Sequence, residues 1–152
     1  MDATFYEELA KNVSNGPTPY VNEAHLRAEV VEKGHVRLCL PVSEGHLNHV
    51  GMAYAGSEFV LAEIAGGTFF MATYGTDEYV PVLKGVEIKY LAPGKTDLFC
   101  EICLSEDEAN QKIAEVRERG RGNYFLDVEV KDLTGTTVAE FHFNYYALPA
   151  MK

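Results

Sequence analysis

The segment from Met52 to Thr73 constrains the fold more than any other part of the chain, because it is long enough for a helix and apolar almost all round. Only two charges, Glu58 and Glu63, interrupt it. An acid at the centre of a bilayer costs on the order of 2.5–3.5 kcal/mol, and neither end of the segment has a Lys/Arg cluster, so a membrane span is disfavoured. A helix that is apolar on every side must be covered on every side. The segment therefore predicts a buried central helix.

Alternating apolar and polar residues predict strands on both sides of this helix. The predicted strands cover residues 24–32, 35–42, 80–91, 97–104, 124–133 and 137–148. A short amphipathic helix over 4–16, followed by a proline-containing linker, opens the chain, and a capped, charged surface helix is expected in 105–122. One antiparallel sheet wrapped around the central helix would cover most of its apolar surface. We therefore predict a single α+β domain over 1–152, with the N-terminal helix in 1–16 and the core in 17–148.

Composition narrows the range of partners. The formal net charge of −10 argues against a nucleic acid, because phosphate binding needs a dense basic surface, although backbone amides can still hold a small anion. The first residues lack the basic and apolar regions of a signal peptide, which favours a cytoplasmic protein. Cys39, Cys100 and Cys103 show no metal-ligand pattern and are expected as buried free thiols. No metal and no cofactor are indicated.

The stretch "NHVGMAYAG" at 48–56, followed by "LAE" at 61–63, resembles the start of the central helix in hotdog-fold thioesterases. Many of those proteins carry Asn-x-x-Gly-x-x-His-Gly-Gly and then an acid seven residues after the last glycine, as Glu63 follows Gly56. The chain is most similar to a branch of uncharacterised thioesterase-like proteins with an NHxG…AExAGG central helix. The resemblance covers roughly residues 22–148. It implies a hotdog fold, in which the sheet wraps the helix, and hydrolysis of an acyl thioester.

The match is incomplete at one point. The usual His-Gly-Gly is here Tyr54-Ala55-Gly56, which preserves the backbone amides and changes a side chain that could contact substrate. The positions that the resemblance assigns to oxyanion or substrate binding are Gly51, Tyr54, Ala55 and Gly56.

The chemistry of thioester hydrolysis agrees with this assignment. The first turn of a helix has unpaired N–H groups and the positive end of the helix dipole, so the amides near Ala55 and Gly56 could hold the carbonyl oxygen. Glu63, among apolar neighbours, is the candidate base or nucleophile, and its pKa should be raised by burial. The alternative is that Glu63 pairs with a basic residue across an interface. Glu58, about 140° around the helix from Glu63, is expected to be structural or on the helix surface.

The spacing of these groups predicts a homodimer. Glu63 lies roughly 12 Å along the helix axis from Ala55, too far for both to serve one carbonyl. Two antiparallel copies of the helix would bring the Glu63 of one to the Ala55 of the other and create two composite sites. The family resemblance implies the same arrangement, and a dimer of dimers is also compatible with it.

Three further residues are candidates for the site. Asn48 could orient the attacking water, as the matching residue is thought to do in the family, or it could cap the helix entry. His49 could be a substrate-side acid/base or a turn residue that binds backbone. Lys84 could point inward to a carboxylate, with Glu63 of a second copy as the obvious partner, or face solvent.

The leading hypothesis is a hydrolase of an acyl thioester, conjugated to coenzyme A or to a carrier protein. One alternative is a hotdog (de)hydratase that uses His49 and Glu63, which are fourteen residues apart, although the His-Phe-Pro and Pro-Gly elements of that class are absent. The other is a non-catalytic acyl-ligand-binding module, which would not need an ionisable residue at 63.

Overall fold

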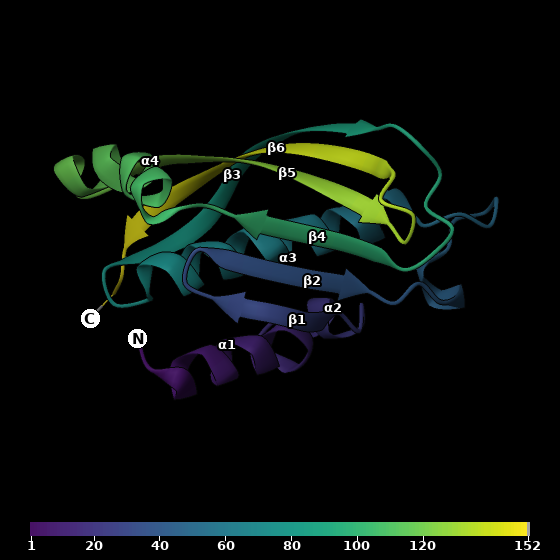
Figure 1. The fold of residues 1–152 in the computed structure, drawn as a ribbon, viewed down its shortest axis with the longest axis horizontal. Coiled ribbons are helices and arrows are strands. Elements are labelled where there is room, and N and C mark those ends of the chain that lie inside the picture. The colour runs from purple at the N-terminus through teal and green to yellow at the C-terminus, as the bar shows by residue number, and fades with distance from the viewer. Residues whose placement is uncertain (152) are drawn as a thin grey trace.

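The computed structural model describes residues 1–151 and has one antiparallel sheet packed on one long helix (Figure 1). The strand order is β1-β2-β4-β5-β6-β3. The helices are α1 (Ala3–Asn15), α2 (Pro19–Asn22), α3 (Ala55–Tyr74), α4 (Glu106–Arg119) and the 3-10 turn η1 (Glu44–His46). The strands are β1 (Arg27–Glu32), β2 (His35–Leu40), β3 (Tyr79–Tyr90), β4 (Leu98–Cys103), β5 (Gly122–Asp132) and β6 (Thr137–Pro149). The predicted α+β hotdog architecture is confirmed.

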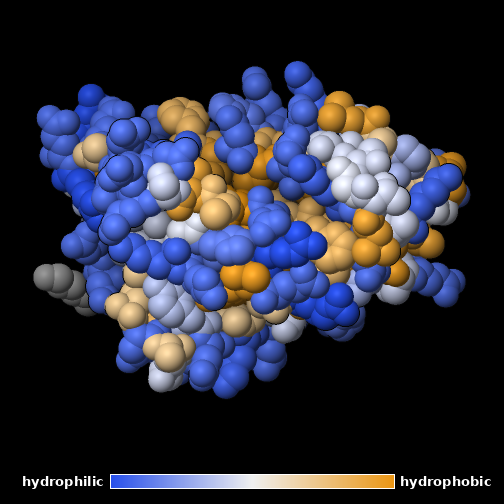
Figure 2. Space-filling model, in the orientation of Figure 1, coloured by the Kyte–Doolittle hydropathy of each residue, from blue (hydrophilic) through white to orange (hydrophobic). Residues whose placement is uncertain are grey.

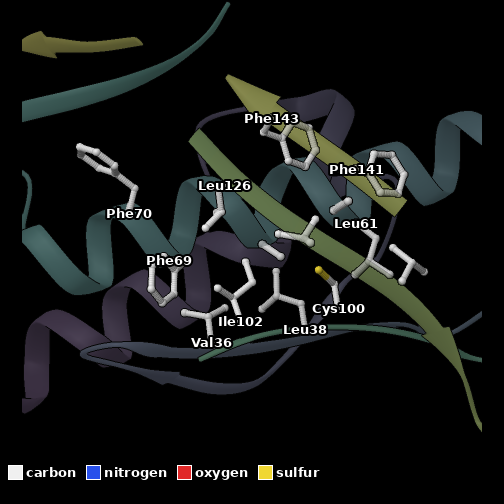
Figure 3. Packing of buried hydrophobic residues seen from close by; sticks show 14 of the residues in the cluster. Val36, Leu38, Leu61, Phe69, Phe70, Cys100, Ile102, Leu126, Phe141 and Phe143 are labelled. Carbon is white, nitrogen blue, oxygen red and sulfur yellow. The ribbon is translucent and has the colours of Figure 1, made fainter. Parts of the chain in front are cut away.

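The core lies between α3 and the concave face of the sheet. Leu61, Ala65 and Phe69 of α3 are fully buried. They belong to a single cluster with the inward residues of the strands, which include Val36, Leu38, Ile102, Leu126, Phe141 and Phe143 (Figure 3). Truncating one of these large side chains to Ala should cost about 2–5 kcal/mol of stability. The sheet therefore covers most of the apolar surface of α3, as predicted from the sequence.

The central helix begins three residues later than predicted. Ala53 N–H donates to the carbonyl oxygen of Gly94 at 2.7 Å, and Tyr54 N–H donates to that of His46 at 2.8 Å. These bonds hold the chain extended up to Tyr54, so α3 starts at Ala55. Two hydrogen bonds thus join the residues directly before α3 to the loops that contain Gly94 and His46.

Two shifts near the N-terminus have local causes. The expected linker contains the short helix α2, which Pro19 opens at a position where its missing N–H costs nothing. The first strand starts at Arg27 rather than at residue 24, because Ala24 and His25 donate their amides to the end of α2. These differences leave the topology unchanged.

The prediction of three buried free thiols is wrong for one of them. Cys39 and Cys100 are buried, whereas Cys103 is exposed. Cys100 and Cys103 are three positions apart on β4, and side chains that far apart on a strand point to opposite faces of the sheet.

None of the helices in residues 1–151 combines the length and apolarity that a membrane crossing requires.

The two edges of the sheet differ. Strand β1 packs against α1, which lies beneath it in Figure 1. Strand β3 has twelve residues and, within residues 1–151, pairs only with β6. A long strand with one unpaired side is a template for pairing with another chain.

Candidate functional site

The loop that leads into α3 is held by a buried histidine that the sequence analysis did not single out. His46 accepts a hydrogen bond at Nδ1 from the backbone N–H of Ser43, at 3.0 Å. Its Nε2 lies 2.8 Å from the carbonyl oxygen of Ala24 and donates to it, since Nδ1 is already an acceptor. His46 is 6% exposed. It ties residues 43–46 to the segment before β1 and so positions the helix entrance.

Asn48 shapes the turn that follows. Its Oδ1 accepts hydrogen bonds from the amides of Val50 at 3.0 Å and Met52 at 3.1 Å. Gly51 completes the turn with φ of 77°, a conformation that favours glycine. Asn48 therefore orders the turn before the helix, while Tyr54 occupies the N-cap position itself. His49 is exposed at the tip of this turn.

The first turn of α3 leaves two backbone donors free. The amides of Ser57 and Glu58 both donate to the carbonyl oxygen of Tyr54, at 2.9 and 3.2 Å. Within residues 1–151, the amides of Ala55 and Gly56 have no acceptor. Two adjacent N–H groups at the positive end of a helix are suited to bind an oxyanion.

The glycine at position 56 and a tyrosine from β3 define this turn. A Cβ at Gly56 would lie 2.4 Å from the ring of Tyr54, so a larger residue would displace that ring. The hydroxyl of Tyr90 donates a 3.0 Å hydrogen bond to the carbonyl oxygen of Ala55. The end of β3 thereby fixes the peptide that follows Ala55, which carries the Gly56 amide.

A cavity of about 380 Å³ lies at this end of the helix, and its lining includes Asn48, Ala55, Glu58 and Tyr90. Apolar side chains surround it. They include Met52 and Leu91, and Leu91 is 53% exposed. Figure 2 shows apolar side chains at the right-hand end of the molecule, where β3 ends and the loop before α3 lies in Figure 1. The site combines free amides with apolar surface, as an acyl group with a polar carbonyl would require.

Glu58 was expected to be either structural or on the helix surface, and it does not lie on the surface. Glu58 is only 3% exposed, and burial raises the pKa of its carboxyl to about 7. The surface alternative is wrong because the loop after β3 folds over this side of the helix. A Cβ at Gly94 in that loop would lie 2.9 Å from Oε1 of Glu58.

Glu63 lies on a different flank of α3. It lines a cleft of about 550 Å³ between α1, α3 and the start of β3, together with Leu9, Ile64 and Met71. Burial raises its pKa above the ordinary value, as expected from its neighbours. Glu58 and Glu63 line different cavities, so the two acids do not form a pair.

The flank of α3 near Glu63 is open. A Cβ at Gly67 would meet nothing within 4 Å, whereas one at Gly66 would lie 2.2 Å from the hydroxyl of Tyr145. Ile64 and Met71 on this flank are only partly buried. The sheet covers one side of the helix and leaves this apolar strip beside the unpaired edge of β3.

The inward orientation that was considered for Lys84 is wrong. Lys84 is exposed and points to the convex face of the sheet, where its Nζ lies 3.3 Å from Oδ1 of Asn123 and 5.2 Å from the ring centre of Tyr146. A bulge between Leu83 and Gly85 shifts the pairing with β6. Residues before and after the bulge therefore alternate in different phase, and the solvent-facing alternative holds.

The structure thus gathers some of the predicted site residues and separates others. Asn48 and Ala55 share the cavity at the helix entrance, with Gly56 beside it, and Glu58, which was not predicted as a site residue, lines the same cavity. Glu63 lies two turns further along α3, and Lys84 lies on the other side of the sheet. Within residues 1–151, no three His, Cys, Asp or Glu side chains gather in the way that a metal ion would need.

Comparisons with known proteins agree with this fold. A structure from Pseudomonas aeruginosa, PA5026, described as a protein of unknown function and probable thioesterase, is 34% identical over 94% of this chain and 95% of that one, with a TM-score of 0.83. The protein smu.793 from Streptococcus mutans, solved with acetyl-CoA bound, is 25% identical over 84% of this chain and 91% of that one, with a TM-score of 0.64.

A hypothetical thioesterase from Streptococcus pneumoniae, solved with coenzyme A, is 22% identical over 84% of this chain and 91% of that one, and with a TM-score of 0.64 it shows the shared fold. No curated protein matches the chain. The sequence model of DUF4442, a domain of unknown function, matches residues 7–147. The chain therefore belongs to the DUF4442 family and has the hotdog fold of the thioesterase-like structures that it resembles.

Proposed function

We propose that this protein hydrolyses an acyl thioester of coenzyme A. The observation that carries the proposal is the pair of unpaired amides, Ala55 and Gly56, at the mouth of an apolar cavity. Such donors stabilise the negative charge that develops on a carbonyl oxygen during acyl transfer. The bound acetyl-CoA in the Streptococcus mutans relative supports a ligand of this class. A carrier-protein thioester would present the same carbonyl group.

The active form would be a homodimer. Glu63 and Ala55 of one chain are roughly 12 Å apart along the helix axis, too far to act on one carbon. The open flank of α3 at Gly67 and the unpaired edge of β3 support antiparallel packing of two copies along this side. Each site would then combine the helix entrance of one copy with Glu63 of the other, and further association of dimers is compatible with this arrangement.

The reaction would follow from these positions. The thioester oxygen accepts hydrogen bonds from the Ala55 and Gly56 amides, which withdraw charge from the carbonyl carbon. Glu63 of the second copy removes a proton from water, and the water oxygen bonds to that carbon. The C–S bond then breaks, and the protonated Glu63 returns the proton to the leaving thiolate, which gives a carboxylic acid and a thiol. Direct attack by Glu63, followed by hydrolysis of the anhydride, gives the same products. Asn48 has its Oδ1 occupied by two amides, which leaves Nδ2 available to position the water.

A panel of acyl-CoAs of increasing length, assayed for release of free thiol, tests the proposal. The wild type should hydrolyse at least one of them, and Glu63→Gln should lose about 10²–10⁴-fold in kcat while it remains folded. Glu118→Gln, on the exposed side of α4, is the matched control and should retain wild-type activity.

Other results would contradict the proposal. Tight binding of acyl-CoA without hydrolysis at any chain length would indicate a binding module. Conversion of an enoyl-CoA to its hydroxy form, with loss of activity in His49→Ala, would indicate a hydratase.

A further inference from the structure

Glu58 is a buried acid without a partner. It is 3% exposed, and no hydrogen bond or ion pair within residues 1–151 reaches its carboxyl. Its Oε1 lies beside Gly94, at a position that Ala53 and Leu98 also approach, and the residue lines the cavity at the helix entrance. Burying an unpaired carboxyl costs stability, and such groups concentrate at functional sites. Neither the structural role expected for Glu58 nor the proposed hydrolysis explains why an acid is buried here.

Glu58 shares the first turns of α3 and one cavity with the residue that carries the first free amide, Ala55. Helical side chains tilt toward the N-terminus of their helix, so the carboxyl of Glu58 leans toward the first turn of α3. Glu58 lines the same cavity as Ala55 and Asn48. A ligand that bound to the unpaired amides would therefore lie beside this carboxyl.

Within residues 1–151, no cationic side chain pairs with Glu58, and the positive field that it feels comes from the N-terminal end of α3. From β3, the phenol of Tyr90 lines the cavity, and its own pKa is raised by burial and, to a lesser extent, by Glu58. The loop after β3 carries Lys95, which is exposed, and Asp97, whose Oδ1 accepts a hydrogen bond from the Val42 amide. The segment before α3 contributes the neutral Asn48. Burial outweighs the effect of the helix dipole at this position and raises the pKa of Glu58, which favours the protonated form.

We propose that the protonated carboxyl of Glu58 is a third donor of the oxyanion site and binds the thioester carbonyl oxygen beside the amides of Ala55 and Gly56. This inference rests on the proposed function. A carboxylate could only accept a hydrogen bond and would repel the developing oxyanion, whereas a neutral carboxyl donates to it, as other enzymes exploit. The raised pKa of Glu58, about 7, keeps a large neutral fraction near neutral pH.

Two acids of α3 would then act in opposite protonation states. Glu58 is active when neutral and Glu63 when ionised. Hydrolysis should therefore increase with pH as Glu63 loses its proton and decrease above about pH 7 as Glu58 does.

Three variants test this role by steady-state kinetics between pH 5 and 9. Glu58→Gln keeps a donor of similar shape that does not titrate, so it should retain kcat within about 10-fold and lose the decrease above pH 7. Glu58→Leu removes the donor and should lower kcat by about 10²–10³-fold. Glu118→Gln is the control. An unchanged alkaline limb in Glu58→Gln, or full activity in Glu58→Leu, would overturn the proposal.

A binding experiment separates this inference from the proposed activity. In a ketone analogue of acetyl-CoA, a methylene group replaces sulfur, so the carbonyl cannot be hydrolysed. Calorimetry at pH 7.5 in buffers of different ionisation enthalpy should show that the wild type takes up part of one proton per protomer on binding, because the bound carbonyl favours neutral Glu58. Glu58→Gln should bind without uptake.

The two results can fail independently. A wild type that hydrolyses no acyl-CoA but takes up a proton through Glu58 contradicts the proposed function alone. Equal proton uptake in wild type and Glu58→Gln, or no binding of the analogue by the wild type, overturns the role of Glu58.

Discussion

The hydroxyl of Tyr145 donates a 2.8 Å hydrogen bond to the main-chain carbonyl oxygen of Glu63, which joins the centre of α3 to β6. Tyr145 is 1% exposed, and Gly66, one turn further along the helix, leaves space for its hydroxyl. The sheet thus fixes the backbone at the residue whose carboxyl is proposed to act in the neighbouring copy. The sheet therefore fixes the position of Glu63 relative to β6.

Gly66→Ala should destabilise the protein by about 1–3 kcal/mol, because the added methyl would overpack a site that the Tyr145 hydroxyl already fills. Chemical denaturation with a linear extrapolation measures the change. Tyr145→Phe provides the matched background: it should cost about 0.5–1.5 kcal/mol alone and should reduce the cost of Gly66→Ala. Strict additivity of the two changes would show that the glycine and the hydroxyl do not interact.

Gly67→Phe should abolish the dimer and leave the fold intact. A Cβ at this position meets nothing within one chain, but the proposed partner helix would pack there. Sedimentation velocity should show a monomer with wild-type circular dichroism, and thioesterase activity should decrease by at least about 100-fold, because each site would lose its acid. Gln111→Phe, on the exposed side of α4, should remain dimeric. A fully active monomer would rule out the composite site.

Glu58→Gln should stabilise the protein at alkaline pH. In the folded protein the pKa of Glu58 is about 7, above the value of about 4.3 in an unfolded chain. The folded state therefore binds the proton more tightly, so wild-type stability should decrease as pH rises from about 4.5 to 7, by up to about 3 kcal/mol, and then level off. Glu58→Gln lacks this contribution, so its advantage should grow over that interval. Thermal unfolding of both proteins at pH 4.5 and 8 measures this stability difference. A difference between the two proteins that does not change with pH would show that the pKa of Glu58 is not raised in the folded state.

Most of the architecture was accessible from the sequence, because its signals are local. Apolar alternation located every strand, and the all-apolar segment around Leu61 predicted the covered helix. The helix-entry motif and the spacing to Glu63 were sufficient to suggest the hotdog fold. These features depend on residues that are close in the chain.

The parts that could not be predicted depend on distant contacts. Glu58 is buried by the loop around Gly94, thirty-six positions later, which no periodicity of the helix reveals. Lys84 faces outward because a bulge changes the alternation of its strand. The structural role of His46 could not be predicted, because its partner is a backbone carbonyl oxygen, that of Ala24, and no residue type in the sequence marks such a contact.

The composite site can be tested by complementation between two inactive chains. Ala55→Pro removes one donor of the oxyanion site and preserves the helix, because proline is favoured at the first helical position and Tyr54, with φ of −64° and ψ of 136°, already has a conformation that a following proline accepts. Glu63→Gln removes the acid. Each homodimer should lose at least about 10²-fold in kcat. The two chains, with different affinity tags, can be co-expressed and the mixed dimers purified.

The activity of those mixed dimers tests the central claim most directly. If each site takes its amides from one copy and its acid from the other, a mixed dimer holds one complete site and one doubly defective site. It should then show about half of the wild-type kcat per dimer. Activity no higher than the mean of the two inactive parents would contradict the account, because it would place Glu63 and Ala55 in sites formed by one chain or remove them from the chemistry altogether.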